Sequence, residues 1–159
     1  MTPDARSERL DAAVATVDHG PAAAAELRTF LEHYYADLAT EDLLAQRPED
    51  LLGAAVSHRE LARRRRPGTT LVRVSTPTVE SDGWSTGHSV VEIVTDDMRF
   101  LVDSVTAELH LQDRPVHLTV HPQLSVRRGE DVVLRQLRAA DDADADPRAV
   151  RESGVQVQI

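Results

Sequence analysis

The sequence has no cysteine and no lysine, and its aromatic residues are two phenylalanines, two tyrosines and one tryptophan. The lack of cysteine excludes disulfides and thiolate metal sites, and it is compatible with a reducing compartment. The lack of lysine excludes Schiff-base chemistry and catalysis by an activated lysine. Because much of the 41% hydrophobic content is alanine, the core should be aliphatic and modest in size.

Long apolar runs are also missing. None approaches the roughly 20 residues that a membrane-spanning helix requires. The N-terminus, MTPDARSERLD, carries charges where a signal peptide needs an apolar core. We therefore expect a soluble, cytoplasmic protein, formed by one domain or by one small domain with an extension.

The formal net charge of -9 argues against nucleic acid and anionic membrane as partners. The exception is a run of four arginines at 63–66, followed by Pro67-Gly68. In the last turn of a helix, such a run complements the negative end of the helix dipole. We interpret it as a solvated cap or a docking surface for an acidic neighbour.

Residues 1–68 are predicted to be a helical segment. A first helix begins at Ser7 or Asp11 and ends at Gly20, where glycine suits a left-handed cap. Pro21 and Pro48 fit the first turns of two further helices, with a short turn near Thr40 between them. Apolar residues recur at spacings of three and four along these segments.

The stretch 88–112 organises the second part of the chain. Val90, Val91, Ile93 and Val94 form a β-branched run of strand length, which Asp96 and Asp97 interrupt. A helical pattern starts at Met98, and its apolar stripe comprises Met98, Leu101, Val102, Val105 and Leu109. Asp97 can cap this helix. Phe100 and Asp103 fall on the opposite side, where a large aromatic side chain either invites a partner or folds back over the loop.

Further strands are predicted around this unit. Residues 69–76 should form an antiparallel neighbour of the strand at 88–94, with Trp84 more suited to cover the sheet edge than to bind a ligand. Residues 116–127 and 131–137 read as a hairpin, residues 141–146 as a mobile charged loop, and residues 152–159 as a last strand.

No recognisable catalytic motif is present. His117 and His121 lie on a predicted strand, about 13 Å apart at 3.4 Å per residue, which is too far to share one metal ion. Asp96 and Asp97 are adjacent at a turn and should point apart. We find no dinucleotide fingerprint, phosphate loop or nucleophile elbow. Catalysis by this chain alone is therefore not expected.

The run from His88 to Val105, with its Asp-Asp-Met-Arg-Phe-Leu-Val-Asp-Ser core, resembles the N-terminal region of the large NAD-dependent glutamate dehydrogenases. Trp84, Tyr34-Tyr35, His58 and His121-Pro122 support the resemblance, which covers most of the chain from about Phe30 onward. It implies an ACT-type βαββαβ module preceded by helices. It also implies that the chemistry, oxidative deamination of L-glutamate to 2-oxoglutarate with NAD, belongs to a downstream catalytic domain that this chain lacks.

The resulting fold prediction is α+β, with a helical segment at 1–68 and an ACT-like antiparallel sheet with one covering helix at 69–159. The last strand ends without a turn signal, so we expect a module truncated after its third core strand. We expect the N-terminal helices, or the strand from Thr69, to take part of the place of the missing second helix and fourth strand. An uncovered strand edge is a further expectation.

The sequence departs from the family pattern at two positions. Arg99 stands where the family has proline, and Phe100 stands where amino-acid-binding ACT modules generally have glycine. The bulky ring favours docking over small-molecule sensing. The predicted ligand or docking residues are Asp96, Asp97, Met98, Arg99, Phe100, Asp103 and Trp84, with no catalytic or metal residues.

The predicted partners are downstream domains or subunits of the dehydrogenase, an amino-acid effector, or a second copy of the chain. NAD is expected only in the catalytic domain of the parent enzyme. The alternative function is a free-standing amino-acid-sensing module that uses the turn at 96–100.

Overall fold

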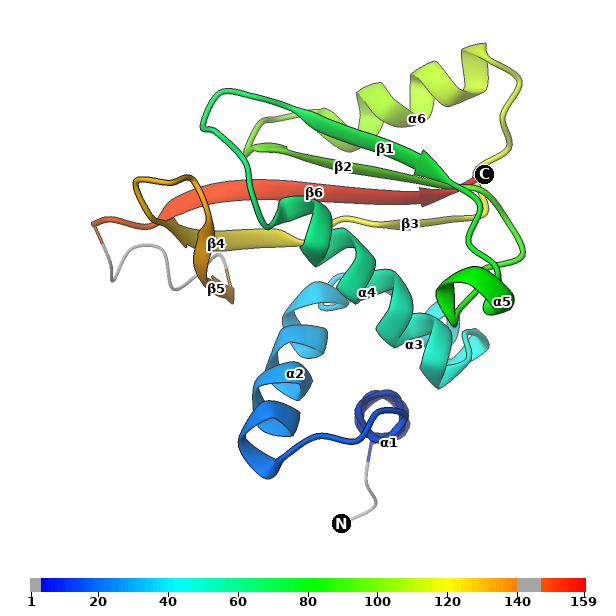
Figure 1. The fold of residues 1–159 in the computed structure, drawn as a ribbon. Helices are drawn as coiled ribbons and strands as arrows, with labels where there is room; N and C mark the ends of the chain where they lie inside the picture. Colours follow the sequence, from blue (N-terminus) through cyan, green and yellow to red (C-terminus); the bar gives the residue numbers. More distant parts are fainter. Residues whose placement is uncertain (1–3, 140–146) are drawn as a thin grey trace.

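The computed structural model describes residues 4–139 and 147–159, which form three layers (Figure 1). An antiparallel sheet lies in the middle, one helix (α6, Leu101–Leu111) covers one face, and the N-terminal helices lie on the other. This architecture confirms the predicted α+β class with an ACT-like sheet. The predicted loop at 141–146 lies outside the described residues.

The N-terminal layer contains α1 (Ala5–Ala15), α2 (Pro21–Tyr34), α3 (Thr40–Ala45) and α4 (Pro48–Ala62). Proline occupies the first turn of α2 and α4, as predicted. The predicted bounds of the first helix were wrong. Asp4 caps α1 by accepting from the Arg6 backbone N–H, and Gly20 precedes α2 as its N-cap.

These helices enclose the largest of the hydrophobic clusters. Burial of each leucine side chain there contributes roughly 1.5–3 kcal/mol. Val120 joins the cluster from the sheet, so the helical layer and the sheet share one core. Its buried members are Leu10, Ala13, Leu27, Phe30, Leu31, Tyr34, Tyr35, Leu38, Leu43, Leu51, Leu52, Ala55 and Val120.

The sheet has the order β1-β2-β6-β4-β5, and every pair is antiparallel. Its strands are β1 (Leu71–Ser75), β2 (Val90–Asp96), β3 (Leu118–Val120), β4 (Gln123–Arg128), β5 (Leu134–Ala139) and β6 (Val150–Gln158). The predicted pairing of β1 with β2 is confirmed, with Val72 opposite Ile93. The predicted strand at 116–127 is interrupted at His121-Pro122, and its two parts, β3 and β4, both pair with β6.

Strand β6 lies at the centre of the sheet, between β2 and the pair β3 and β4. Strand β1 lies beside β2, on the side away from β6. It therefore occupies the place of the missing fourth strand of a βαββαβ module, which was one of the two alternatives expected for that gap. The predicted boundary at residue 68 falls between α4 and β1. Whether the two parts are independent domains stays a prediction.

Helix α6 packs over β2 and β6. Its stripe of Leu101, Val102, Val105 and Leu109 contacts the cluster formed by Val91, Ile93, Val155 and Val157, as the helical spacing predicted. A short helix that the sequence analysis did not predict, α5 (Val79–Asp82), follows β1 and ends at Gly83, whose φ of 78° suits glycine. Within the described ranges, no helix is long and apolar enough to cross a membrane.

Candidate functional site

Most of the predicted site residues lie in the turn that joins β2 to α6. Asp96 is the last residue of β2, and its carboxylate accepts from the Arg65 guanidinium at 2.5 Å and from the Gly68 backbone N–H at 2.8 Å. The hydrogen bond from Arg65 holds the pKa of Asp96 below its usual value. Asp96 therefore anchors the connection between α4 and β1 at the start of the turn.

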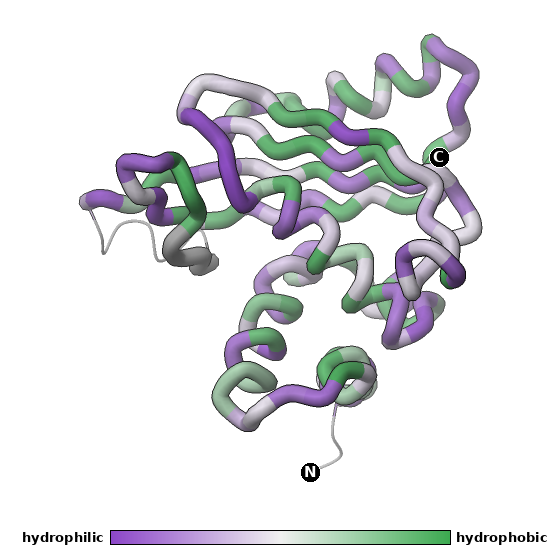
Figure 2. The backbone as a smooth tube through the Cα atoms, viewed as in Figure 1, coloured by the Kyte–Doolittle hydropathy of each residue, from purple (hydrophilic) through white to green (hydrophobic). Residues whose placement is uncertain are grey.

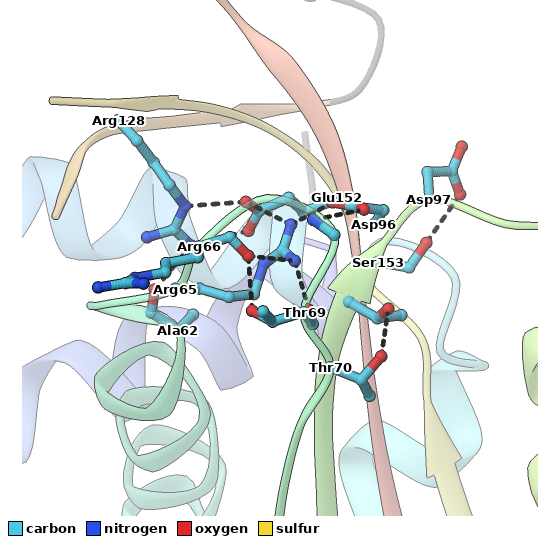
Figure 3. A network of polar contacts seen from close by, with 12 residues as sticks. Ala62, Arg65, Arg66, Thr69, Thr70, Asp96, Asp97, Arg128, Glu152 and Ser153 are labelled. Carbon is cyan, nitrogen blue, oxygen red and sulfur yellow. Dashed lines mark hydrogen bonds and ion pairs between the residues drawn. The ribbon is translucent and has the colours of Figure 1, made fainter. Parts of the chain in front are cut away.

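Arg65 belongs to the arginine run but is 1% exposed, so the interpretation of the run as a solvated cap was wrong at this position. The rest of the run lies in a hydrophilic segment of the chain between α4 and β1 (Figure 2), and Arg63, Arg64 and Arg66 are exposed. Arg65 also donates to the carboxylate of Glu152 on β6 at 2.9 Å (Figure 3). A buried cation of this kind requires close partners, because its desolvation is costly.

Glu152 is shared by two guanidiniums. Arg128 on β4 donates to both of its carboxylate oxygens at 2.8 Å, in addition to the contact from Arg65. Arg128 also donates to the Ala62 carbonyl at 2.7 Å, where α4 ends. The network of Arg65, Asp96, Arg128 and Glu152 therefore joins three strands to the C-terminus of α4, beside the β2–α6 turn (Figure 3).

Asp97 does not cap α6, so that prediction was wrong. Its carboxylate accepts from the Ser153 hydroxyl at 2.8 Å, and its backbone N–H donates to the Arg151 carbonyl at 3.3 Å. Both contacts attach the turn to β6. The position just before α6 is taken by Phe100, and among the residues that the structure describes no side chain caps the helix there.

Phe100 combines two unusual features. Its φ of 61° is left-handed, which costs a residue other than glycine about 1–2 kcal/mol. The residue is 72% exposed, which favours the outward position over the alternative in which the ring folds back over the loop. A strained backbone that holds a large aromatic ring in solvent is the most distinctive feature of the turn.

Met98, Arg99 and Asp103 are exposed around Phe100. Met98 was expected in the buried stripe of the helix, but it is 49% exposed because α6 begins only at Leu101. The turn and the first residues of α6 thus present Met98 and Phe100 together with one cation, Arg99, and two anions, Asp97 and Asp103. The roles of these residues in ligand binding or docking stay predictions.

Trp84 does not share this surface. It is 8% exposed and packs with Ala54 and Val90, between α4 and the start of β2. A Cβ atom added at Gly53 would overlap the Trp84 ring, so the ring lies directly against the α4 backbone. Trp84 is a core residue at the join between the helices and the sheet, rather than a docking residue.

A buried His58 lies on the helical side of the sheet. Its Nε2 must donate to the Ile93 carbonyl at 2.8 Å, because a carbonyl only accepts. Its Nδ1 then accepts from the Tyr34 hydroxyl at 2.7 Å, and burial, which raises the pKa of Tyr34, keeps that proton in place. The adjoining cavity is small, with a volume of about 30 Å³.

Burial lowers the pKa of His58, so acid should destabilise the fold. Below about pH 6.5 the unfolded chain binds a proton that the folded chain does not. The free energy of unfolding should therefore fall by up to about 1.4 kcal/mol per pH unit from this group. We expect His58→Gln to reduce that slope between pH 6.5 and 5 in urea-unfolding series.

Burial also lowers the pKa of His121, which acts in the same pH window. The matched variant His121→Gln measures that contribution separately. A wild-type stability that is constant between pH 6.5 and 5 would contradict the buried neutral state of His58.

Sequence reasoning missed the buried charges. Glu92 in β2 is fully buried, and it accepts from Arg73 of β1 at 2.7 Å. Glu92 and Glu152 are charged residues that interrupt sequence patterns typical of strands. Such an interruption was the available signal for a buried ion pair. Within 4–139 and 147–159, no group of three or more histidine or acidic residues could hold a metal ion.

Comparison with known proteins identifies similar sequences. The family model described as "Glutamate dehydrogenase, ACT1 domain" matches residues 30–159. A protein named NAD-specific glutamate dehydrogenase from Halomonas elongata is 35% identical over 136 residues, covering 86% of this chain and 8% of the relative. One of the same name from Pseudomonas aeruginosa is 32% identical over 118 residues, covering 74% and 7%. The chain thus spans only a small part of these relatives, and no solved structure matches it.

Proposed function

The chain belongs to the glutamate dehydrogenase ACT1 domain family, and on that premise we propose that it is a noncatalytic regulatory or assembly module of a large NAD-dependent glutamate dehydrogenase. In this proposal the parent enzyme converts L-glutamate, NAD⁺ and water to 2-oxoglutarate, ammonium and NADH in its own catalytic domain. The module docks on downstream domains or on another subunit, and the whole protein is cytoplasmic.

The observation that carries the proposal is Phe100. Its left-handed backbone is unfavourable by about 1–2 kcal/mol. Because the ring is exposed, it gains little hydrophobic stabilisation from burial within this chain. A contact outside the chain would recover that burial. Met98 and the partly exposed apolar residues of α6 extend the surface around the ring.

The Phe100 proposal predicts opposite effects on stability and assembly. In the isolated chain, Phe100→Gly should raise the free energy of unfolding by about 0.5–1 kcal/mol, because relief of strain exceeds the entropy that glycine adds to the unfolded state. Phe100→Ala keeps the strain and should not stabilise. In the parent enzyme both variants should weaken subunit or interdomain association about tenfold or more, as measured by sedimentation.

Leu111→Ala is the matched control. Leu111 is 79% exposed at the other end of the same helix, so its truncation removes a similar apolar group away from the turn. Normal assembly and turnover of the Phe100→Ala parent enzyme would refute the docking role.

The second candidate is an amino-acid sensor. It is favoured by the lack of a side-chain cap at the start of α6, which leaves backbone N–H groups for a carboxylate. Thermal-shift measurements with the common amino acids test it. Saturable stabilisation by one of them, lost in a variant of the turn, would favour sensing over docking.

A further inference from the structure

The outer edge of β1 is unpaired. In the sheet order β1 is a terminal strand, and within the described ranges only β2 pairs with it. Val72 and Val74 are 59% and 62% exposed on the face that carries α6, since they lie opposite Ile93 and Val91. A free row of backbone donors and acceptors is thus combined with two solvent-exposed valines.

This edge also lacks the usual protection against pairing. Natural edge strands carry bulges, prolines or outward charges. The β1–β2 register runs unbroken from Leu71 to Ser75. The single charge, Arg73, lies on the opposite face, where its guanidinium donates to Glu92 and, at 2.8 Å, to the Ser57 carbonyl.

Helix α6 leaves this part of the sheet uncovered. Its apolar stripe contacts valines and an isoleucine of β2 and β6, while the exposed valines belong to β1. No residue of α6 is fully buried, so its apolar stripe also remains partly open to solvent. The exposed valines of β1 therefore lie on the same face of the sheet as α6, beyond the part that the helix covers.

The sequence of the edge indicates what covers it. Residues 70–76 read Thr-Leu-Val-Arg-Val-Ser-Thr, which is nearly palindromic about Arg73. An antiparallel pair with a two-fold axis at Arg73 places Val72 opposite Val74 of a second copy, and Thr70 opposite Thr76. The two arginines meet at the axis, but each guanidinium is paired with Glu92 of its own chain.

We propose that the partner of this edge is a second copy of the chain, paired antiparallel through β1 across that axis. The sheets of the two copies then form one continuous sheet, and four valines cover one another on the α6 face. This inference goes beyond the proposed function, because it rests on β1 and does not require Phe100.

Sedimentation equilibrium of the 159-residue chain tests the proposal. The wild type should dimerise, and Val72→Lys with Val74→Lys should weaken the dimer at least tenfold. The double variant Val17→Lys with Val79→Lys is the matched control. Val17 lies between α1 and α2 and is 49% exposed, and Val79 lies in α5 and is 52% exposed, so both are solvent-exposed valines outside β1. The control should leave dimerisation unchanged.

A monomeric wild type at millimolar concentration would overturn the proposal. So would a dimer that survives the two lysines in β1. Circular dichroism of each variant verifies that the fold persists, as expected for substitutions at exposed positions.

Crosslinking tests the register, and the absence of native cysteine makes it specific. Directly opposed residues have Cα atoms about 4.5–5.5 Å apart, within the range of a disulfide, whereas diagonal neighbours are about 7–8 Å apart. A mixture of Val72→Cys and Val74→Cys chains should therefore crosslink faster under mild oxidation than either variant alone. Equal rates in all three samples would refute the register.

Discussion

Replacement of Glu152 by alanine should lower the free energy of unfolding of the chain by about 3–5 kcal/mol, the cost of breaking a buried ion pair. Arg65 and Arg128 are nearly inaccessible to solvent, and both direct guanidinium N–H groups at this carboxylate. Without it, two positive charges remain buried, with Asp96 as the nearby carboxylate that Arg65 still contacts. Chemical denaturation followed by circular dichroism measures the loss.

Glu60→Ala is the control for the Glu152 prediction. Glu60 forms an exposed pair with Arg63 at 3.7 Å, and such pairs contribute about 0–1 kcal/mol. Glu152→Gln should be intermediate, because the amide keeps a hydrogen-bond acceptor but loses the charge. A Glu152→Ala chain as stable as the Glu60→Ala chain would show that the network does not hold the sheet to α4.

Truncation of Trp84 to alanine is the second large effect, with an expected loss of about 3–5 kcal/mol. The ring fills the space between Gly53, Ala54 and Val90, so its removal leaves a cavity at the join between α4 and the sheet. In the wild type, the single tryptophan should give a blue-shifted emission that moves to longer wavelength on unfolding.

Val79→Ala provides a local comparison for Trp84. Val79 is 52% exposed on α5, five residues from Trp84, so its truncation should change stability by less than about 0.5 kcal/mol. A small loss on Trp84→Ala, together with solvent-exposed emission in the wild type, would contradict the core position. That result would support the ligand-binding or docking role that the sequence predicted for Trp84.

The network and the proposed docking turn are physically connected. Asp96 is held by Arg65 and Gly68, and Asp97 is held by Ser153, so both ends of the short segment before Met98 are fixed to the sheet or to the α4–β1 link. Phe100 therefore projects from a supported turn. A rigid support of this kind lowers the entropy that is lost when an exposed ring docks.

Local patterns predicted the elements well because they depend on neighbours in sequence. Apolar residues at spacings of three and four predicted the buried stripe of α6, and runs of β-branched residues predicted β1 and β2. Prolines predicted where α2 and α4 begin. The sequence also placed Phe100 outward, but by projecting a helix that was expected to begin at Met98. Phe100 instead precedes α6, and its left-handed backbone holds the ring in solvent. The family resemblance added the ACT-like arrangement, which the fold and the family comparison confirm.

These local patterns could not predict contacts between residues that are far apart in the sequence. Asp97 is a residue type that commonly caps helices, but its carboxylate accepts from the hydroxyl of Ser153, 56 residues away, and this contact holds it on β6. Arg65 looked like its exposed neighbours, and Trp84 looked like a loop residue. In each case the deciding contact comes from a segment that sequence periodicity does not relate to the residue.

The sequence by itself thus determined the class of the fold and most of its elements, because propensity and periodicity act within a few residues. Only the tertiary structure decided which charges are buried, where Trp84 packs and which strand edge stays open. The reason is that burial and charge pairing depend on chain segments brought together by folding, as Glu152 and Arg65 are, 87 residues apart.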